Sequence, residues 1–264
     1  MPELAEVAFA CSKWNSGLDK RVREAATLPT SRVYRESDHT EFSNLLTGKK
    51  LILAETHGKQ MLFSFSGNIY LGIHLGMTGS LANEPATYEI QKYDALVLRQ
   101  SECSLVFRDP RQFGRLRISC RTKPPPWWSD LPPSITENEF NLEIVEKAVI
   151  RHNRRPIKAL LLDQNYFPGM GNWMADEVLW RAKLRPSRLA GTLDVNEIAY
   201  LYNQTLFVAK GAMKSVGIKG GDPPKGWLFH VRWKDGLLCP KTKLPLIRES
   251  IGGRTTCWSP SYQS

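Results

Sequence analysis

A proline-rich run at positions 121–134 divides the chain into two parts with different sequence patterns. Five of these fourteen residues are proline, which fixes φ and removes a backbone hydrogen-bond donor, so the run continues neither a helix nor a sheet. Before it, short runs rich in β-branched and aromatic residues alternate with turn formers. After it, apolar residues recur at helical spacing. The run is therefore predicted to be an interdomain linker.

The same patterns predict individual elements. A helix is expected over residues 3–15, where Leu4, Val7, Ala8 and Cys11 follow helical spacing. Strands are expected over residues 50–55, 60–67, 68–75, 93–100, 103–109 and 114–119. Further helices are expected over residues 140–152, 156–164, 173–183 and 195–215, with Pro156 in a first turn. Residues 227–258 are interpreted as a strand, a loop and a C-terminal hairpin.

These elements indicate an α+β fold. Short strands joined by tight turns favour an N-terminal antiparallel β-sandwich domain, here headed by a helix. A C-terminal helical domain and a β-hairpin follow. The predicted boundaries are 1–120, the linker at 121–134, then 135–226 and 227–264. A cleft between two domains is a natural place for a ligand.

The charge balance points to a polyanionic partner. Lys and Arg number 36 against 26 acidic residues, which gives a formal charge of +10, and duplex DNA is the commonest polyanion such a chain meets. No apolar run of about 18 residues is present, so no membrane span is expected. The start of the chain lacks the pattern of a signal peptide. Five scattered cysteines indicate a reducing, cytosolic compartment rather than a disulfide framework.

The first six residues are Met1-Pro2-Glu3-Leu4-Ala5-Glu6. Proline after the initiator methionine permits removal of Met1, which exposes a secondary amine. An α-amino group titrates near pH 8, about two units below lysine, and can attack a sugar carbon to give an iminium. Glu3 and Glu6 would donate or accept protons. Alternatively, Pro2 starts a helix and the glutamates complement its dipole.

Further motifs decide between these interpretations. After the opening PELAEV come HGKQMLF, GIHLGMTGS, DPRQFGRL, the stretch IKALLLDQNYFPGMGNWMADEVLW, and GGRTT. In this order they resemble the formamidopyrimidine-DNA glycosylases, the MutM-type repair enzymes, from residue 2 to residue 263. The only departure within the opening is Ala5 for a proline. A single motif is a weak signal, whereas the ordered combination is specific.

The resemblance implies a role for each matched residue. Pro2 and Glu3 would be catalytic, assisted by Glu6, Lys59 and Arg254. His74, Asn172 and Arg254 would contact phosphate, and Lys158 and Arg154 match basic positions that face DNA. Met77 would fill the space of the flipped base, Phe113 would wedge into the stack, and Arg111 would read the orphaned base. These roles suit base flipping, which needs apolar wedges and a guanidinium to replace lost stacking and pairing.

The C-terminal hairpin departs from the family, which carries two CxxC pairs that bind zinc. Of the four expected positions only Cys239 is cysteine, and the others are Thr242, Ser259 and Tyr262. Tetrahedral zinc needs four good ligands, so no metal and no other cofactor is expected, and the hairpin is interpreted as a zincless finger. Leu246 and Trp258 are its candidate core residues. A disulfide between Cys239 and Cys257, which lies two places before an expected ligand, is the disfavoured alternative in the cytosol.

Two further departures concern the substrate. Residues 216–229 form a short glycine-rich segment where relatives carry a longer loop over flipped 8-oxoguanine, so formamidopyrimidines and hydantoins are expected to be better substrates. Tyr93 stands where the family has a DNA-contacting histidine.

The sequence therefore predicts a monomeric, bifunctional glycosylase and lyase acting on double-stranded DNA with oxidised bases or abasic sites. Three alternatives stay open: endonuclease VIII-like specificity for oxidised pyrimidines, a non-catalytic lesion-binding protein that keeps Met1, and a plain basic DNA-binding protein.

Overall fold

The computed structural model describes residues 1–264, which form two compact units. The first comprises residues 1–2 and 6–131, and the second comprises residues 3–5 and 132–264. The boundary at Leu131 and Pro132 falls inside the proline-rich run. Residues 3–5 belong to the second unit because the backbone N–H of Leu4 donates to the carbonyl of Gly169 at 3.0 Å, and Leu4 and Ala5 join that unit's apolar core.

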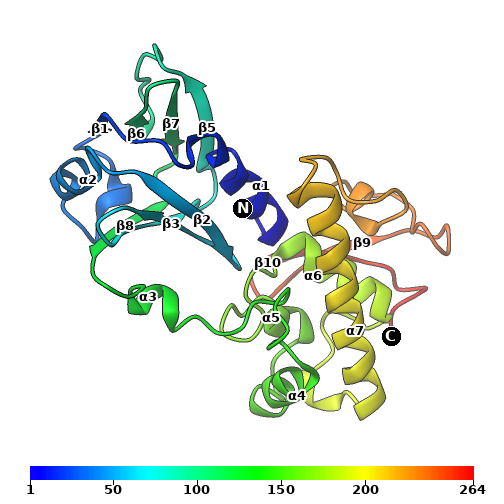
Figure 1. Ribbon diagram of the computed structural model, residues 1–264. Coiled ribbons are helices and arrows are strands. Elements are labelled where there is room, and N and C mark those ends of the chain that lie inside the picture. The colour runs from blue at the N-terminus through cyan, green and yellow to red at the C-terminus, as the bar shows by residue number, and fades with distance from the viewer. The chain divides into compact units, whose positions relative to one another are not determined.

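The first unit contains two antiparallel four-stranded sheets, ordered β1-β6-β7-β5 and β2-β3-β4-β8. Its elements are α1 (Leu4–Ser12), whose first two residues belong to the second unit, η1 (Asn15–Gly17), β1 (Glu24–Thr27), η2 (Arg32–Tyr34), α2 (His39–Leu46), β2 (Leu51–His57), β3 (Gln60–Phe65), β4 (Ile69–His74), β5 (Ser80–Pro85), β6 (Asp94–Arg99), β7 (Cys103–Arg108), β8 (Arg115–Cys120) and α3 (Pro126–Ser129). One apolar core joins both sheets, with Trp14 against Phe63 at 4.6 Å between ring centroids. Figure 1 shows the sheets as two layers.

The six expected strands are confirmed as β2, β3, β4, β6, β7 and β8. Two strands, β1 and β5, were not predicted from the sequence. Both are edge strands of one sheet, with the sequences EAAT and SLANEP, which contain few of the β-branched and aromatic residues typical of strands. Pairing with β6 and β7 makes them strands. The expected first helix ends early, at Ser12.

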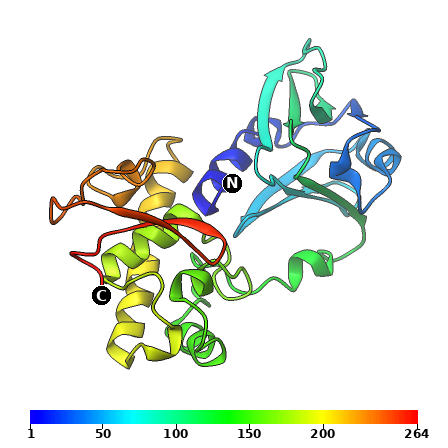
Figure 2. The same ribbon diagram turned by 180° about the vertical axis from the view of Figure 1, so that it is seen from behind.

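The second unit is mainly helical. Its elements are α4 (Leu142–Arg151), α5 (Ile157–Leu161), α6 (Asn172–Ala182), η3 (Ala190–Thr192), α7 (Val195–Ala212), η4 (Met213–Gly217), η5 (Leu228–His230), β9 (Ile247–Ile251) and β10 (Arg254–Trp258). A capping box of Asp194 and Glu197 starts α7, which packs beside α6 (Figure 1). The β9–β10 hairpin crosses α6, as Figure 2 shows from behind.

Several boundaries in this unit differ from expectation. Pro156 precedes α5 as its N-cap rather than lying in its first turn, and α7 changes to a π-helical turn after Ala212. The strand expected at the start of residues 227–258 is wrong, because Leu228–His230 is a 3₁₀ turn. Its Phe229 packs edge-on against Trp173 of α6, so tertiary aromatic packing sets this local conformation.

The finger hairpin has a small core of its own. Leu246, Cys239 and Cys257 are buried with Trp180 and Leu228, and Trp258 is buried as well. Leu246 and Trp258 are thus core residues, as predicted. No helix in the structure is long and apolar enough to cross a membrane.

Candidate active site

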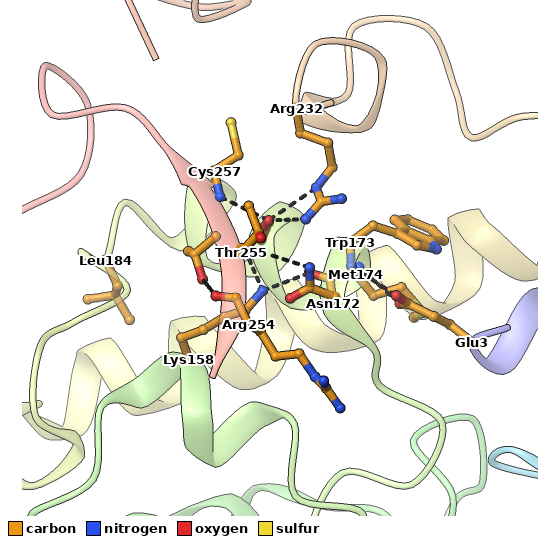
Figure 3. Close-up of polar contacts among 12 residues, drawn as sticks. Glu3, Lys158, Asn172, Trp173, Met174, Leu184, Arg232, Arg254, Thr255 and Cys257 are labelled. Carbon is orange, nitrogen blue, oxygen red and sulfur yellow. Dashed lines mark hydrogen bonds and ion pairs between the residues drawn. The ribbon is translucent and has the colours of Figure 1, made fainter. Parts of the chain in front are cut away.

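Glu3 lies at the N-terminus of helix α6. Its Oε1 accepts the backbone N–H of Trp173 at 2.9 Å and its Oε2 accepts that of Met174 at 3.1 Å (Figure 3). Only 3% of Glu3 is exposed. Two N–H donors at the positive end of a helix stabilise the charged carboxylate. Glu3 thus occupies two of the backbone amides at the start of α6.

Gly171 makes room for this carboxylate. Its φ of −128° is open to any residue, but a Cβ added there would lie 2.1 Å from Cδ of Glu3. Gly169 is different, since its φ of +93° favours glycine. Within the turn PGMGN one glycine therefore serves backbone conformation and the other serves the seating of Glu3.

Pro2 immediately precedes this buried carboxylate in the chain. The Cα atoms of consecutive residues are about 3.8 Å apart, so an amine on Pro2 is tied closely to Glu3. Pro2 itself is half-buried, whereas Met1 is exposed. Glu6 lies in the first turn of α1.

Asn172 and Arg254 are linked through the hairpin. The side-chain Nδ2 of Asn172 donates to the carbonyl of Thr255 at 2.8 Å, next to Arg254. Arg254 is exposed at the start of β10, after Gly252 and Gly253, which have positive φ. Figure 3 shows its side chain extending away from the other labelled residues. The hairpin therefore presents Arg254 beside the N-terminus of α6.

Lys158 does not face the solvent, which contradicts the prediction that it contacts DNA. The side chain is 0% exposed. Its Nζ donates to the carbonyl of Asn172 at 2.7 Å and pairs with Asp176. Burial lowers the pKa of Lys158, and the neighbouring Asp176 opposes that shift. The basic position matched by sequence thus supports Asn172 from within the protein. Arg154, by contrast, is exposed.

A cleft of about 420 Å³ lies between α5 and the tip of the hairpin. It is lined by Arg155, Ala159, Leu162, Asp163, Gly252, Gly253 and Arg254. Arg155 pairs with Asp163 at 2.8 Å and also donates to the carbonyl of Ala159. Arg155 was not predicted as a site residue, although it adjoins Arg154 in the run NRRP. Its place in the cleft depends on the fold of α5 against the hairpin.

Lys59 and His74 are neighbours on one sheet of the first unit. Lys59 follows Gly58 in the two-residue turn between β2 and β3, and Gln60 pairs with His74 of β4. Burial lowers the pKa of His74 to about 4, helped by the positive charges of Lys59 and three nearby arginines. The N–H of Gly76 donates to Nδ1 at 3.1 Å. His74 is therefore neutral at pH 7 with its proton on Nε2, where it can serve as a donor.

Met77, Arg111 and Phe113 are brought together by two touching loops. A Cβ on Gly76 would lie 2.4 Å from the carbonyl carbon of Phe113, so these backbones are in direct contact. Met77 is 42% and Phe113 is 48% exposed. The guanidinium of Arg111 lies over the Phe113 ring at 4.9 Å. Large exposed apolar side chains beside an arginine suit insertion into a base stack.

Asp109 holds these two loops and was not singled out from the sequence. It is buried, and it accepts hydrogen bonds from the Thr78 hydroxyl at 2.7 Å and from the Gly114 N–H at 2.6 Å. Its own N–H donates to the carbonyl of Tyr93, whose ring is partly exposed beside Lys92. The structure thus places Tyr93 next to the same loops. The cue for Asp109 was its position in DPRQFG, directly before the turn.

The finger residues do not fit a zinc ion. No group of three or more His, Cys, Asp or Glu residues is arranged to hold a metal. Burial acts to raise the pKa of the Cys239 thiol, but hydrogen bonds from Thr242, Ser259 and Trp180 together outweigh burial. The pKa of Cys239 is therefore lowered from its usual value to about 7. The Thr242 and Ser261 hydroxyls lie 2.8 Å apart. All five cysteines, Cys11, Cys103, Cys120, Cys239 and Cys257, are free, so hydrogen bonds and packing join this region.

The fold and this site define a two-unit protein with a β-rich part and a helix–two-turn–helix part. Two domain models match these parts. The formamidopyrimidine-DNA glycosylase N-terminal domain matches residues 1–116, and the formamidopyrimidine-DNA glycosylase H2TH domain matches residues 131–220. The chain is 32% identical to the Roseiflexus formamidopyrimidine-DNA glycosylase, with both chains fully covered. It is also 32% identical to the Thermus thermophilus enzyme of that name, covering 100% of this chain and 98% of the relative. The chain belongs to the formamidopyrimidine-DNA glycosylase family.

Solved structures agree with the fold. A complex of the Lactococcus lactis protein with DNA containing an oxidised pyrimidine matches with a TM-score of 0.89 at 23% identity, over 99% of each chain. A MutM complex with DNA containing carbocyclic 8-oxo-G matches with a TM-score of 0.88 at 24% identity, over 99% of each chain.

Proposed function

We propose that this protein is a bifunctional DNA glycosylase that excises oxidised purines from duplex DNA and then cleaves the strand at the abasic site. The observation that carries this proposal is the carboxylate of Glu3, held by the amides of Trp173 and Met174 directly beside Pro2 in the chain. A positioned carboxylate beside an N-terminal amine is the pair that nucleophilic base excision needs.

In the proposed first step, the nitrogen of Pro2, exposed by loss of Met1, forms a bond to C1′ of the damaged nucleotide. The glycosidic bond breaks, and its electron pair leaves with the base. The attacking amine gives its proton to the Glu3 carboxylate, and Glu3 then passes a proton to the departing base. Glu3 therefore acts from its charged form, which its two N–H donors favour. The C1′–O4′ bond then breaks as the nitrogen lone pair forms the C=N bond of an iminium, and the ring oxygen takes a further proton from solvent.

Strand cleavage follows from the iminium. It acidifies the 2′ proton, whose removal expels the 3′ phosphate, and loss of the 4′ proton then expels the 5′ phosphate. Lys59 and Arg254 assist by stabilising the leaving phosphates, and Glu6 serves as a further proton carrier. The products are a gap with phosphate at both ends.

We infer that four residues bind the phosphates around the extruded nucleotide: Lys59, His74, Asn172 and Arg254. Arg154 and Tyr93 contact the DNA farther from that nucleotide. His74 acts here as a neutral donor through Nε2, because Gly76 occupies Nδ1. Neutral and charged donors both bind phosphate, but only the charged ones release counterions. The cleft that Arg155 shares with Arg254 has the size and charge for an adjoining backbone phosphate.

The base pair is opened, in this proposal, by the loop residues of the first unit. Met77 and Phe113 replace the flipped base in the stack, and Arg111 bonds the orphaned partner. Extrusion costs a few kcal/mol of lost stacking, which apolar wedges offset.

Formamidopyrimidines and hydantoins are the proposed substrates. The segment after α7 is short, and its far end is fixed because the Trp227 ring fills the space beside Gly211. Phe229 is tied to Glu177 of α6 at 3.3 Å. A segment fixed in this way cannot fold far over a flipped 8-oxoguanine, so that base should be a poorer substrate.

The chemistry has a direct test. Borohydride reduction during reaction should trap a covalent adduct, and the DNA should map to the peptide that begins at Pro2. Protein that retains Met1, identified by intact mass, should form no such adduct, and Pro2→Gly should lose it while Glu3 is retained. An adduct mapped to Lys59, or none, would overturn the mechanism. Cleavage of duplexes with formamidopyrimidine, hydantoin, 8-oxoguanine and thymine glycol, opposite C and A, then tests the substrate class. Preference for thymine glycol would indicate endonuclease VIII-like specificity instead.

A further inference from the structure

We propose that Asp176, Lys158 and Arg232 are positioning residues that hold the hairpin on helix α6 and thereby place Arg254 for its phosphate. The inference rests on the phosphate contact of Arg254 in the proposed function. None of the three would touch DNA. Lys158 and Asp176 have no exposed side-chain surface, and only 4% of the Arg232 side chain is exposed.

Strand β10 crosses α6 and is hydrogen-bonded to it at two points. The carbonyl of Thr255 accepts from the Asn172 side chain at 2.8 Å, and the N–H of Cys257 donates to Oδ2 of Asp176 at 3.1 Å (Figure 3). The two bonds start from residues one helical turn apart on α6 and end two residues apart on β10, so a displacement of the strand over the helix would break both.

Asp176 is the centre of this attachment. Its Oδ1 accepts from Nζ of Lys158 on α5, and its Oδ2 accepts from the guanidinium of Arg232, with Nε at 3.1 Å. Four donors from α5, from the segment before the finger and from β10 thus converge on one carboxylate of α6. Figure 3 shows the side chains of Lys158 and Arg232 and the backbone nitrogen of Cys257 directed toward the same part of that helix.

Burial makes this attachment resistant to displacement. Two buried basic side chains, Lys158 and Arg232, share the single carboxylate of Asp176. A buried charge is tolerated only where it is paired and hydrogen-bonded. Displacing β10 would leave Asp176 with fewer donors in a place that water does not reach. The network therefore resists movement of the hairpin, which is the task that a metal ion performs in other small β-hairpins.

Arg254 is the group that this fixation places. Both attachment points, Thr255 and Cys257, lie in the same short strand as Arg254, one and three residues after it. Its own side chain is exposed, and it therefore depends on the backbone of β10 for its position. Loss of one donor to Asp176 should let the hairpin shift and weaken the contact between Arg254 and phosphate.

The test is a double-mutant cycle on the full chain. Arg232→Met, Arg254→Met and the double variant are compared for binding to a duplex with a stable abasic-site analogue, over a range of salt concentrations. Arg248→Met is the matched control, because Arg248 lies on β9 and pairs with the exposed Asp235 at 3.3 Å. We expect Arg254→Met to bind about tenfold more weakly and to lower the salt slope by about 0.9.

If Arg232 acts through Arg254, Arg232→Met shows most of the loss of affinity and most of the decrease in salt slope seen for Arg254→Met. The double variant then binds no more weakly than Arg254→Met alone. Arg248→Met binds like the parent. Arg232→Lys keeps the positive charge but has one donor group, so its affinity for the duplex should lie between that of Arg232→Met and that of the parent. Should Arg232→Met be unfolded by melting analysis, Arg232→Lys carries the same cycle.

Two results would overturn the inference. Independent, additive losses in the double variant would mean that Arg232 does not act through Arg254, and parent-like binding by the folded Arg232→Met would mean that it positions nothing. The proposed function would survive both. If Arg254→Met itself bound like the parent, the phosphate contact would be wrong and the positioning role with it, whereas borohydride trapping would still report on Pro2.

Discussion

Replacing Gly171 by alanine should separate base excision from DNA binding. The new Cβ would lie 2.1 Å from Cδ and 2.2 Å from Cγ of Glu3, whereas carbon atoms normally approach to about 3.5 Å. Glu3 must therefore move by roughly 1.4 Å, because Gly171 is held in the turn PGMGN as the N-cap of α6. At φ −128° alanine itself is unstrained, so the change acts through Glu3 alone.

The expected loss follows from that movement. A displacement of about 1 Å at a catalytic group costs on the order of 100-fold in rate, and Glu3 would also lose its two short bonds to the amides of Trp173 and Met174. Single-turnover release of a formamidopyrimidine base should thus slow about 100-fold, which corresponds to about 2.7 kcal/mol. Binding of an abasic-analogue duplex should change less than threefold. Overpacking should lower the stability by about 1–3 kcal/mol.

Two controls make this prediction decisive. Gly221→Ala is the matched glycine change, since a Cβ there would meet its nearest atom at an ordinary 3.7 Å, and it should excise like the parent. Glu3→Gln combined with Gly171→Ala should be no slower than Glu3→Gln alone, because both changes act on one carboxylate. Excision by Gly171→Ala at the parent rate would refute the reasoning that Glu3 must occupy this position.

Three other predictions concern buried charges and the finger. Asp176→Leu leaves the buried Lys158 and Arg232 without their shared carboxylate and should lower the free energy of unfolding by about 3–5 kcal/mol. Lys158→Met leaves Asp176 paired with Arg232 and should lower it by about 1–3 kcal/mol. Equal losses in urea titrations would contradict the pairing. The pKa of His74 is lowered to about 4 in the folded chain, so the unfolded chain binds the extra proton as pH falls below about 6.5. Stability should therefore decline from about pH 6.5 to about pH 4, and His74→Gln should flatten that profile. Chelators should leave melting temperature and base excision unchanged, and metal analysis should find no zinc, because Cys239 alone remains of four ligands; one bound equivalent would refute this.

Local sequence was sufficient for those features that depend on neighbouring residues. Proline at positions 121–134 predicted the break between the two units, because proline acts on its own backbone. Six strands and the major helices followed from the spacing of apolar residues. The loops that carry Lys59, His74, Met77, Arg111 and Phe113 were recognised because each lies in one continuous motif.

Only the tertiary structure decided what depends on distant residues. Glu3 and Trp173 are 170 residues apart, and Asp176 and Arg232 are 56 apart, so no local pattern records either contact. For the same reason Lys158 was assigned to DNA, although the fold buries it against Asp176. The edge strands β1 and β5 lacked strand-forming residues and acquired their conformation from β6 and β7. Motifs thus identified the candidate site residues, and long-range burial and pairing decided which of them are exposed and which are buried and paired within the protein.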